Sequence, residues 1–246
     1  MSIKVLVNGA FGKMGLEVVR AVENESGLTL VGQSDIKDKL DPKIMMLKPD
    51  VVVDFTHPSS VMKNTTIILK GGACPVVGTT GLTEKQLNEI HDLATKEKRG
   101  VIVAPNFAIG AILMMKCAQE VAKYMSSVEI IEYHHDKKAD SPSGTAIKTA
   151  ELVHEQNKLI NTVTKDSTVL ETIKGCRGGT SHNIPIHSVR LPGYVAHQEV
   201  IFGGIGQTLS IRHDTINRES FMPGVILSIK KVVTLKGLVY GLENII

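Results

Sequence analysis

Short runs rich in valine and isoleucine alternate with longer helical segments through the first 105 residues. This alternation predicts a parallel sheet whose strands are joined by crossover helices. Because the runs are almost continuously apolar, each strand is expected to be buried on both faces, as in a doubly wound sheet. The expected strands are IKVLV (residues 3–7), LTLVGQSD (28–35), DVVVDFT (50–56), CPVVGTT (74–80) and GVIVAP (100–105).

Three segments between these strands have helical periodicity, over residues 12–23, 58–70 and 83–98. Thr83 followed by Gln86 fits a capping box at the start of the third helix. We therefore expect a Rossmann-like domain of the α/β class.

A different pattern begins after APNFAIG. We expect a helix over about residues 110–124, a strand at VEIIEYHH (128–135), a helix from about Ser143 and a polar, poorly patterned stretch to residue 180. Three later segments predict antiparallel strands that join the strand at 128–135 in an open mixed sheet, whose edges can pair with partners. They are NIPIHSVRL (183–191), HQEVIFGG (197–204) and QTLSIRHD (207–214). This part is expected to form a second α+β domain.

The end of the chain has a helical pattern over residues 220–234, followed by a short apolar tail. We expect this segment to return to the first domain. The first domain then comprises residues 1–106 and 218–246, and the second comprises residues 107–217. A chain of 246 residues is long enough for two such domains.

The composition, with 42% hydrophobic and 22% charged residues, predicts a soluble globular protein. The net charge of +3 is spread along the chain, which argues against a nucleic-acid partner. No apolar stretch reaches membrane-spanning length and no hydrophobic leader precedes the first strand, so we expect no membrane partner and a cytoplasmic location. Cys74, Cys117 and Cys176 match neither a disulfide framework nor a metal pattern, and we expect reduced, mostly buried thiols.

Three glycines, Gly9, Gly12 and Gly15, lie between the first strand and the first helix. Glycines in this position let the chain turn sharply and approach a pyrophosphate, which binds at the helix N-terminus. The spacing GxxGxxG differs from the commoner GxGxxG, and a tight turn without a ligand is the alternative. The position of the turn after the first strand favours a nicotinamide dinucleotide as cofactor.

Asp35, at the end of the second strand, is where a ribose-binding carboxylate is expected. It favours the free 2′-hydroxyl of NADH, whereas Lys13, Lys37 and Lys39 can neutralise the 2′-phosphate of NADPH, so the choice stays open. Two further strand ends, GTTG (78–81) and APNF (104–107), lie at the same edge of the sheet, where backbone groups can hold the nicotinamide carboxamide. Ordinary strand-to-helix loops are the alternative there.

The stretch EYHHDKKADSPSGTA combines histidines and lysines with the start of a helix. His134 and His135 point to opposite faces of their strand and no third ligand has a zinc-like spacing, so we expect no metal. Cationic side chains and the free N–H groups of a helix start suit a small carboxylate-bearing substrate. A solvated loop in which Ser143 or Thr145 caps the helix is the alternative.

Crowding of positive charges also favours proton donation, because a lysine among cations releases its proton more easily. The crowded residues are His134, His135, Lys137 and Lys138. We expect Lys138 as proton donor and His134 as donor or acceptor in the reduction of a C=N or conjugated C=C bond, with hydride from a nicotinamide.

Six segments resemble, in this order, the 4-hydroxy-tetrahydrodipicolinate reductases, also called dihydrodipicolinate reductases: GAFGKMG, DFTHP, GTTG, APNFAIG, EYHHDKKADSPSGTA and HQEVIFGG. The similarity covers nearly the whole chain, and its specific part is HHxxK followed by SGT. The resemblance implies NADH- or NADPH-dependent reduction of a cyclic dicarboxylate in lysine and diaminopimelate synthesis. It also implies a homotetramer built through the sheet of the second domain.

The resemblance further implies roles for individual residues. His134 resembles the family's proton donor or acceptor, and Lys138 its proton donor. His135, Gly144 and Thr145 resemble residues that bind the substrate carboxylates. The implied cofactor contacts are Gly9, Ala10, Phe11, Gly12, Lys13, Met14, Gly78, Thr79, Thr80, Ala104, Pro105, Asn106 and Phe107, with Asp35 at the adenosine ribose and Arg218 near the cofactor.

The link of 16 positions between Asp35 and Val51 is shorter than in many members of the family, which bears on the adenosine end of the cofactor site. Hinges near APNF and before Ser220 suggest that the domains close over the substrate and expel water.

Two other functions fit the same architecture. One is an oxidoreductase similar to aspartate or homoserine dehydrogenases. The other is a redox sensor that binds NAD(P)H without chemistry, and His134 and Lys138 argue against it because a sensor needs no proton donors.

Overall fold

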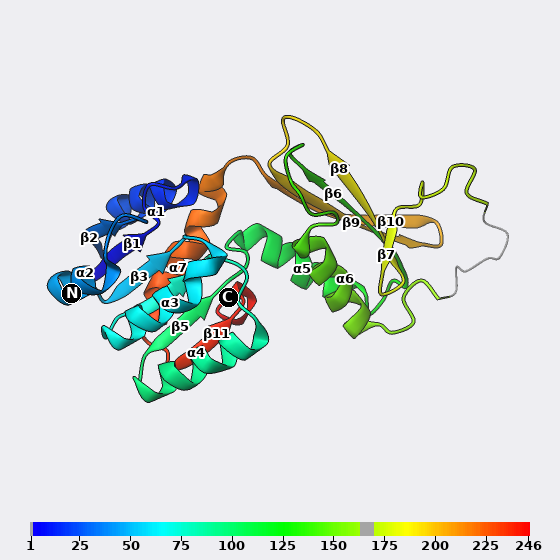
Figure 1. Cartoon of the computed structure of the whole chain (residues 1–246). Coiled ribbons are helices and arrows are strands. Elements are labelled where there is room, and N and C mark those ends of the chain that lie inside the picture. Colours follow the sequence, from blue (N-terminus) through cyan, green and yellow to red (C-terminus); the bar gives the residue numbers. More distant parts are fainter. Residues whose placement is uncertain (1, 163–169) are drawn as a thin grey trace. The chain divides into compact units, whose positions relative to one another are not determined.

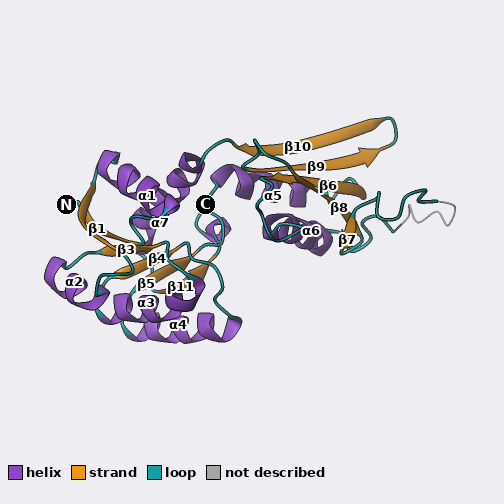
Figure 2. Ribbon diagram, turned by 45° about the horizontal axis from the view of Figure 1, so that its top comes forward, coloured by secondary structure: helices purple, strands orange, loops and turns teal. Residues whose placement is uncertain are grey.

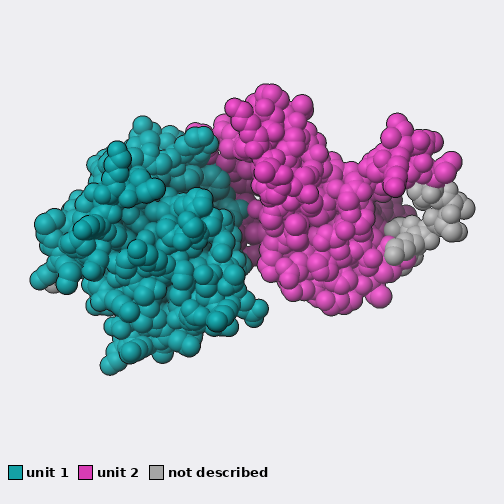
Figure 3. Space-filling model, in the orientation of Figure 1, with its two compact units in different colours: residues 1–109, 218–246 teal, residues 110–217 magenta. Residues whose placement is uncertain are grey.

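The structure is a computed structural model and describes residues 2–162 and 170–246. The poorly patterned stretch expected before residue 180 includes residues 163–169, which lie outside the described residues. The helices and strands (Figures 1 and 2) form two compact units (Figure 3). Unit 1 contains residues up to Ile109 and from Arg218 to the end, and unit 2 is Gly110–Asn217.

Unit 1 contains a six-stranded parallel sheet in the order β11-β5-β4-β3-β1-β2. Its strands are β1 (Ile3–Asn8), β2 (Leu28–Ser34), β3 (Val51–Asp54), β4 (Cys74–Val77), β5 (Gly100–Val103) and β11 (Gly237–Tyr240). Every residue of β3, β4 and β5 is buried, as the almost continuously apolar sequences predict. The predicted Rossmann-like, doubly wound parallel sheet is thus confirmed.

Helices cover both faces of this sheet (Figure 2). On one face α1 (Lys13–Asn24) packs beside α7 (Met222–Val232), and on the other lie α2 (Leu40–Leu47), α3 (Pro58–Lys70) and α4 (Glu84–Lys96). Short 3₁₀ turns at Arg218–Phe221 and Leu242–Asn244 complete the unit. The core between α3, α4 and the sheet gathers the buried side chains of Val61, Leu69, Val77, Ile90 and Val101.

The order of the strands creates a switch point between β1 and β3. From β1 the chain goes to β2 on one side and then returns to β3 on the other. Ligands of open parallel sheets bind at the carboxyl ends of the strands at such a point. The loops that follow β1 and β3 therefore lie where the fold predicts a ligand.

Two elements of unit 1 differ from the sequence-based expectation. No helix is predicted between Asp35 and Val51, where α2 lies; α2 has only 8 residues, with Pro42 in the first turn that tolerates proline. The expected apolar tail forms β11, which pairs in parallel with β5. A strand of 4 residues is too short for an alternation of apolar and polar side chains to identify it in the sequence.

Unit 2 contains a five-stranded sheet in the order β10-β9-β6-β8-β7. Its strands are β6 (Ser127–His134), β7 (Gly179–Ser181), β8 (Ile184–Arg190), β9 (Ala196–Gly204) and β10 (Gln207–Thr215). Helices α5 (Ile109–Val121) and α6 (Gly144–Gln156) cover one face of the sheet (Figure 2), over the buried Val128, Ile130 and Phe202. The predicted second α+β domain with an open mixed sheet is confirmed.

The prediction that the later strands are all antiparallel is wrong for β8. This strand pairs in parallel with β6, whereas β9 is antiparallel to both β6 and β10. The connection from β6 to β8 is long and contains α6, and such a crossover lets two neighbouring strands run in the same direction.

The cysteines are less buried than expected. Cys74 is buried in β4, but Cys117 and Cys176 are exposed, so the prediction of mostly buried thiols is wrong. Cys117 lies on an exposed position of α5, and Cys176 lies in a loop before β7. Across residues 2–162 and 170–246, no helix is both long and apolar enough to cross a membrane.

The capping box predicted at the start of α4 is confirmed and can be tested. Thr83 Oγ1 accepts a hydrogen bond from Gln86 N at 3.3 Å, and Gln86 Oε1 accepts one from Thr83 N at 2.9 Å. Thr83→Ala should lower the free energy of unfolding by about 1 kcal/mol, because N–H groups of the first turn lose their acceptor. Thr83→Ser keeps the hydroxyl and should lower the free energy of unfolding much less. Equal losses for the two variants in urea unfolding would contradict this role of the hydroxyl.

Candidate active site

The glycine-rich turn of unit 1 packs tightly against the ends of β1 and β3. Gly9 has φ +80°, and a Cβ there would lie 2.2 Å from Phe55 O. A Cβ on Gly15 would lie 2.0 Å from Gly9 O, so both positions require glycine. Gly12 is the N-cap of α1 and provides no side-chain cap. The first N–H groups of α1 therefore have no acceptor within the helix and are available to a ligand.

Asp35 lies directly after β2, beside this turn. Its Oδ2 accepts a hydrogen bond from Phe11 N at 3.0 Å, and its Oδ1 accepts one from Ile36 N at 2.7 Å. These bonds fix the carboxylate and leave further lone pairs for ligand hydroxyl groups. Lys37 and Lys39 are exposed on the segment that follows.

Two cavities of unit 1 collect most of the predicted cofactor contacts. The larger, of about 660 Å³, is lined by residues that include Gly9, Phe11, Gly12 and Asp35. The smaller, of about 410 Å³, is lined by residues that include Gly12, Lys13, Met14, Gly78, Thr79 and Thr80. Gly12 lines both cavities, so the turn connects them at the switch point of the sheet.

The residues after β5 lie at the same edge of the sheet but do not line these two cavities. They are Ala104, Pro105, Asn106 and Phe107. Asn106 Oδ1 accepts a hydrogen bond from Ala108 N at 2.9 Å. Phe107 is buried, and its ring centroid lies 5.7 Å from that of Phe55. Residues 104–107, which were predicted as cofactor contacts, thus lie at this edge of the sheet but outside the two cavities.

A buried carboxylate that the sequence analysis did not single out holds the loops around these cavities. Asp54, at the end of β3, is fully buried. Its Oδ2 accepts from Asn8 Nδ2 at 2.8 Å and Asn64 Nδ2 at 3.0 Å. Its Oδ1 accepts from Thr56 Oγ1 at 2.7 Å and Thr79 Oγ1 at 2.8 Å. Asp54 therefore joins the ends of β1, β3 and β4 in one network.

These features of unit 1 fit a nicotinamide dinucleotide. The uncapped start of α1 can take a phosphate, and Gly9 lets the turn before this helix pack closely against Phe55. The Asp35 carboxylate beside this turn can accept hydrogen bonds from the hydroxyl groups of a ribose.

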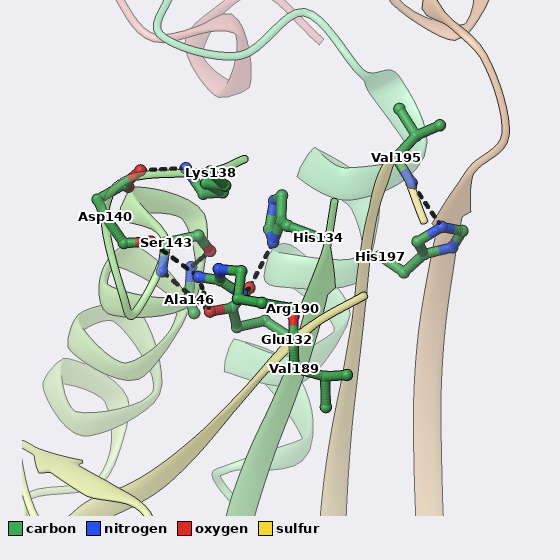
Figure 4. A network of polar contacts seen from close by, with 10 residues as sticks. All are labelled: Glu132, His134, Lys138, Asp140, Ser143, Ala146, Val189, Arg190, Val195 and His197. Carbon is green, nitrogen blue, oxygen red and sulfur yellow. Dashed lines mark hydrogen bonds and ion pairs between the residues drawn. The ribbon is translucent and has the colours of Figure 1, made fainter. Parts of the chain in front are cut away.

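In unit 2 the predicted catalytic residues lie around the carboxyl end of β6 (Figure 4). His134 is the last residue of β6, and its Nδ1 hydrogen-bonds Glu132 Oε2. Arg190, the last residue of β8, donates to Glu132 Oε1 from Nη2 at 2.7 Å and to Oε2 from Nη1 at 2.9 Å. Ser143 N adds a hydrogen bond to Oε1 at 3.3 Å. Donor atoms from β6, β8 and the start of α6 thus converge on one carboxylate.

The Glu132 side chain is 0% exposed. Burial by itself raises the pKa of this carboxyl, but hydrogen bonds from His134, Arg190 and Ser188 outweigh burial and lower the pKa from 4.5 to about 2. Glu132 is therefore ionised at neutral pH.

Lys138 lies in the loop between β6 and α6, and its Nζ is 2.6 Å from Asp140 Oδ1. This ammonium lowers the pKa of Asp140. His134 and Lys138, expected among crowded cationic residues, each also have a carboxylate partner that the sequence analysis did not include. His135, one residue beyond the strand, is exposed.

The start of α6 has room for an anion. Ser143 caps the helix, and its side chain accepts from Ala146 N at 3.2 Å. The N–H groups of Gly144 and Thr145 have no acceptor within the helix. A Cβ on Gly144 would meet no atom within 4 Å, so the space above this turn is open. Over the described part of the chain, no group of three or more His, Cys, Asp or Glu is arranged to hold a metal ion.

Glu132 and Arg190 belong to this site although the sequence analysis did not single them out. A signal for Glu132 existed, because residues two apart on a strand share a face and Glu132 precedes His134 by two. Arg190 comes from a strand far along the chain, and only the parallel pairing of β6 with β8 places it opposite His134.

Two family descriptions match the chain. "Dihydrodipicolinate reductase, N-terminus" matches residues 3–107, and "Dihydrodipicolinate reductase, C-terminus" matches residues 110–246. The chain is 50% identical to a 4-hydroxy-tetrahydrodipicolinate reductase of Desulfitobacterium hafniense (strain DSM 10664 / DCB-2), over 98% of each chain. It is 48% identical to one of Syntrophomonas wolfei subsp. wolfei, over 99% of this chain and 98% of that relative.

Solved structures are also similar to the chain. A dipicolinate-bound dihydrodipicolinate reductase from Paenisporosarcina sp. TG-14 superposes with a TM-score of 0.90 at 45% identity, over 100% of both chains. An amine dehydrogenase from Mycobacterium smegmatis has a TM-score of 0.62 at 11% identity, over 97% of this chain and 95% of that one. The second similarity concerns the fold alone.

The lowered pKa of Glu132 predicts acid sensitivity. A carboxyl whose pKa is lower in the folded state stabilises the fold above about pH 4.5, and this stabilisation is lost as the pH falls toward about 2. Between neutral pH and about pH 3, the free energy of unfolding of the wild type should therefore approach that of Glu132→Gln by about 2 kcal/mol. Urea unfolding from neutral pH to about pH 3 measures this gap. A gap that stays constant with pH would show that Glu132 has an ordinary pKa.

Proposed function

The chain belongs to the family of 4-hydroxy-tetrahydrodipicolinate reductases. From this membership we propose that it converts 4-hydroxy-tetrahydrodipicolinate to tetrahydrodipicolinate with a hydride from NADH or NADPH and a proton, while the 4-hydroxyl group leaves as water. This reaction is a step of lysine and diaminopimelate synthesis. The observation that carries the proposal is the gathering of His134, Lys138 and the open start of α6 in unit 2. The enzyme is accordingly an NAD(P)H-dependent oxidoreductase.

Unit 1 is the cofactor-binding unit in this proposal. The N–H groups at the start of α1 bind the pyrophosphate, and Asp35 binds the adenosine ribose. Residues 78–80 and 104–107 supply backbone groups toward the nicotinamide, and Arg218 lies near the cofactor. When bound, the reduced nicotinamide supplies a hydride.

Unit 2 binds the dicarboxylate substrate. The N–H groups of Gly144 and Thr145, with the Thr145 hydroxyl, bind one carboxylate at the helix start. His135, which is exposed beside this loop, contributes a further contact to the substrate. The open space at Gly144 leaves the helix N–H groups accessible to this anion.

Lys138 and His134 handle the proton of the reaction. Lys138 donates a proton to the reduced substrate, and His134 donates or accepts one through the ring nitrogen that does not face Glu132.

The proposal also covers assembly and location. The sheet of unit 2 carries helices on one face, and we assign its other face to a homotetramer interface. A cytoplasmic location fits a biosynthetic enzyme that uses small soluble metabolites. Light scattering tests the tetramer, and a monomer at micromolar concentration would reject it.

A coupled assay tests the activity directly. The substrate is generated from pyruvate and aspartate semialdehyde by its synthase, and the absorbance of NADH or NADPH is followed. A fall in absorbance that requires the synthase supports the reductase and ranks the two cofactors. Cofactor binding without any such fall would favour the dehydrogenase-like or sensor functions instead.

Removal of either proton-handling group should reduce turnover. His134→Gln and Lys138→Ala should each lower kcat about a hundredfold or more, which is the range for a lost general acid or base. Cofactor binding, measured by fluorescence titration, should stay unchanged. Lys123→Ala removes an exposed lysine of the same unit and serves as the control. Near-normal turnover in both site variants would reject these roles.

The hydroxyl of Thr145 should act mainly in substrate binding. Thr145→Val removes a hydrogen-bond donor to the carboxylate and should raise the substrate KM about tenfold, with a smaller change in kcat. Thr145→Ser keeps the hydroxyl and is the matched control. A KM for the valine variant equal to that of the wild type would remove Thr145 from the site.

A further inference from the structure

Among the residues of unit 2 that the structure describes, three groups have one carboxylate in contact with both a histidine and an arginine. Glu129 contacts His187 Nε2 at 2.8 Å and Arg177, and its side chain is 36% exposed. Asp214 contacts His197 Nδ1 at 2.7 Å and Arg212 Nε at 3.0 Å, and it is 41% exposed. The third group is Glu132 with His134 and Arg190, and only here is the carboxylate completely buried.

Complete burial makes the Glu132 group expensive to form. Removing a charge from water costs several kcal/mol unless its lone pairs are satisfied. Glu132 meets this cost with hydrogen bonds from His134, Arg190 and Ser143 N. The two exposed groups provide ion pairs in the same sheet without this cost. Ion pairing alone therefore does not account for a buried carboxylate at this position.

The bond between Glu132 and His134 fixes the state of the imidazole ring. An ionised carboxylate can only accept hydrogen bonds, so the Nδ1 atom that faces it carries a proton. In neutral histidine the other nitrogen, Nε2, is then unprotonated and is the atom that gains or releases a proton. The His134 side chain is 14% exposed, so the ring is held mainly by its neighbours.

Arg190 connects this carboxylate to the loop that carries Lys138. Besides its two bonds to Glu132, Arg190 donates from Nη2 to Asp140 O at 2.8 Å. The side chain of Asp140 in turn holds Lys138 Nζ at 2.6 Å. Figure 4 shows these residues as one continuous network at the end of β6. His134 and Lys138, the two proposed proton-handling side chains, are thus both linked to the Glu132–Arg190 pair, His134 directly and Lys138 through Asp140.

We propose that Glu132 and Arg190 are positioning residues of the reductase reaction, a proposal that rests on the proposed function of His134 and Lys138. Glu132 holds the imidazole of His134 as the Nδ1–H tautomer, with Nε2 presented to the substrate. Arg190 holds Glu132 in place and fixes the backbone of the loop at Asp140. Neither residue exchanges a proton with the substrate.

The tautomer of His134 tests this proposal without any activity measurement. Nitrogen NMR of protein labelled with ¹⁵N-histidine distinguishes the two tautomers, and the His134 signals are identified by their loss in His134→Gln. The wild type should show the Nδ1–H form at a pH where the ring is neutral. Glu132→Gln should show a mixture or the Nε2–H form, because an amide can donate as well as accept. The Nε2–H form in the wild type, or an unchanged tautomer in the variant, would overturn the proposal.

Kinetics provide the second readout. Glu132→Gln should lower kcat about tenfold or more, as when the partner of a catalytic histidine no longer selects its tautomer. The substrate KM and the affinity for NADPH should change less than about twofold, because neither ligand contacts Glu132 in the proposed arrangement. An equal loss in kcat and in NADPH affinity would indicate general damage and would contradict a positioning role.

A matched control and a second variant complete the design. Glu129→Gln makes the same substitution on the same strand in a group that also contains a histidine and an arginine, and it should keep kcat within about twofold of the wild type when light scattering shows the same assembly. An equal loss of kcat in Glu129→Gln would overturn the proposal. If Glu132→Gln does not fold, Glu132→Asp keeps the charge near Arg190 but withdraws the carboxylate from His134. Glu132→Asp should show the same change of the His134 tautomer and the same loss of kcat as Glu132→Gln. A wild-type tautomer and a wild-type kcat in Glu132→Asp would overturn the proposal.

Activity and tautomer measurements together distinguish a wrong function from a wrong positioning role. If the wild type shows no reductase activity but Glu132 still fixes the tautomer of His134, the proposed function is wrong and the positioning geometry stands. If the wild type is an active reductase but Glu132→Gln keeps full kcat, the function stands and the positioning role is wrong.

Discussion

The buried, ionised carboxylate of Glu132 is the constraint on which the site in unit 2 depends. A charge in this position is tolerated only if several donors are fixed around it, and here they come from the ends of β6 and β8 and from the start of α6. Each donor belongs to a segment that the site needs. Satisfying one carboxylate therefore also sets the orientation of His134, the path of the Lys138 loop and the position of the helix start that we propose binds the substrate.

Unit 1 also contains a buried carboxylate that accepts hydrogen bonds from several segments. Asp54 is fully buried at the end of β3, and its partners come from the ends of β1 and β4 and from α3. The loops that line the two cavities are thereby tied together below the glycine-rich turn. In both units a buried carboxylate at or near the carboxyl end of a strand hydrogen-bonds to the surrounding loops and holds them together. The ligand-binding groups are then largely placed before a ligand arrives.

The sequence predicts most of the fold because its strongest signals are local. Apolar runs identify the central strands of unit 1, and the Thr83 capping box marks the start of α4. The same holds for the glycine-rich turn, where Gly9 and Gly15 are required by close backbone contacts. What the sequence could not supply depends on distant pairing. The parallel register of β6 and β8 brings Arg190 to Glu132, and the folded strand gives His134 a carboxylate partner that the run of cationic residues did not indicate. The strand β11 is recognisable only once β5 is there to pair with it.

The most direct test of the account is a crystal structure with NADPH and pyridine-2,6-dicarboxylate, which carries two carboxylates on a planar ring. The account predicts one carboxylate on the N–H groups of Gly144 and Thr145, His134 Nε2 directed toward the ring, and Nδ1 still bonded to Glu132. A dicarboxylate bound away from the start of α6, or a His134 ring turned away from Glu132, would contradict it.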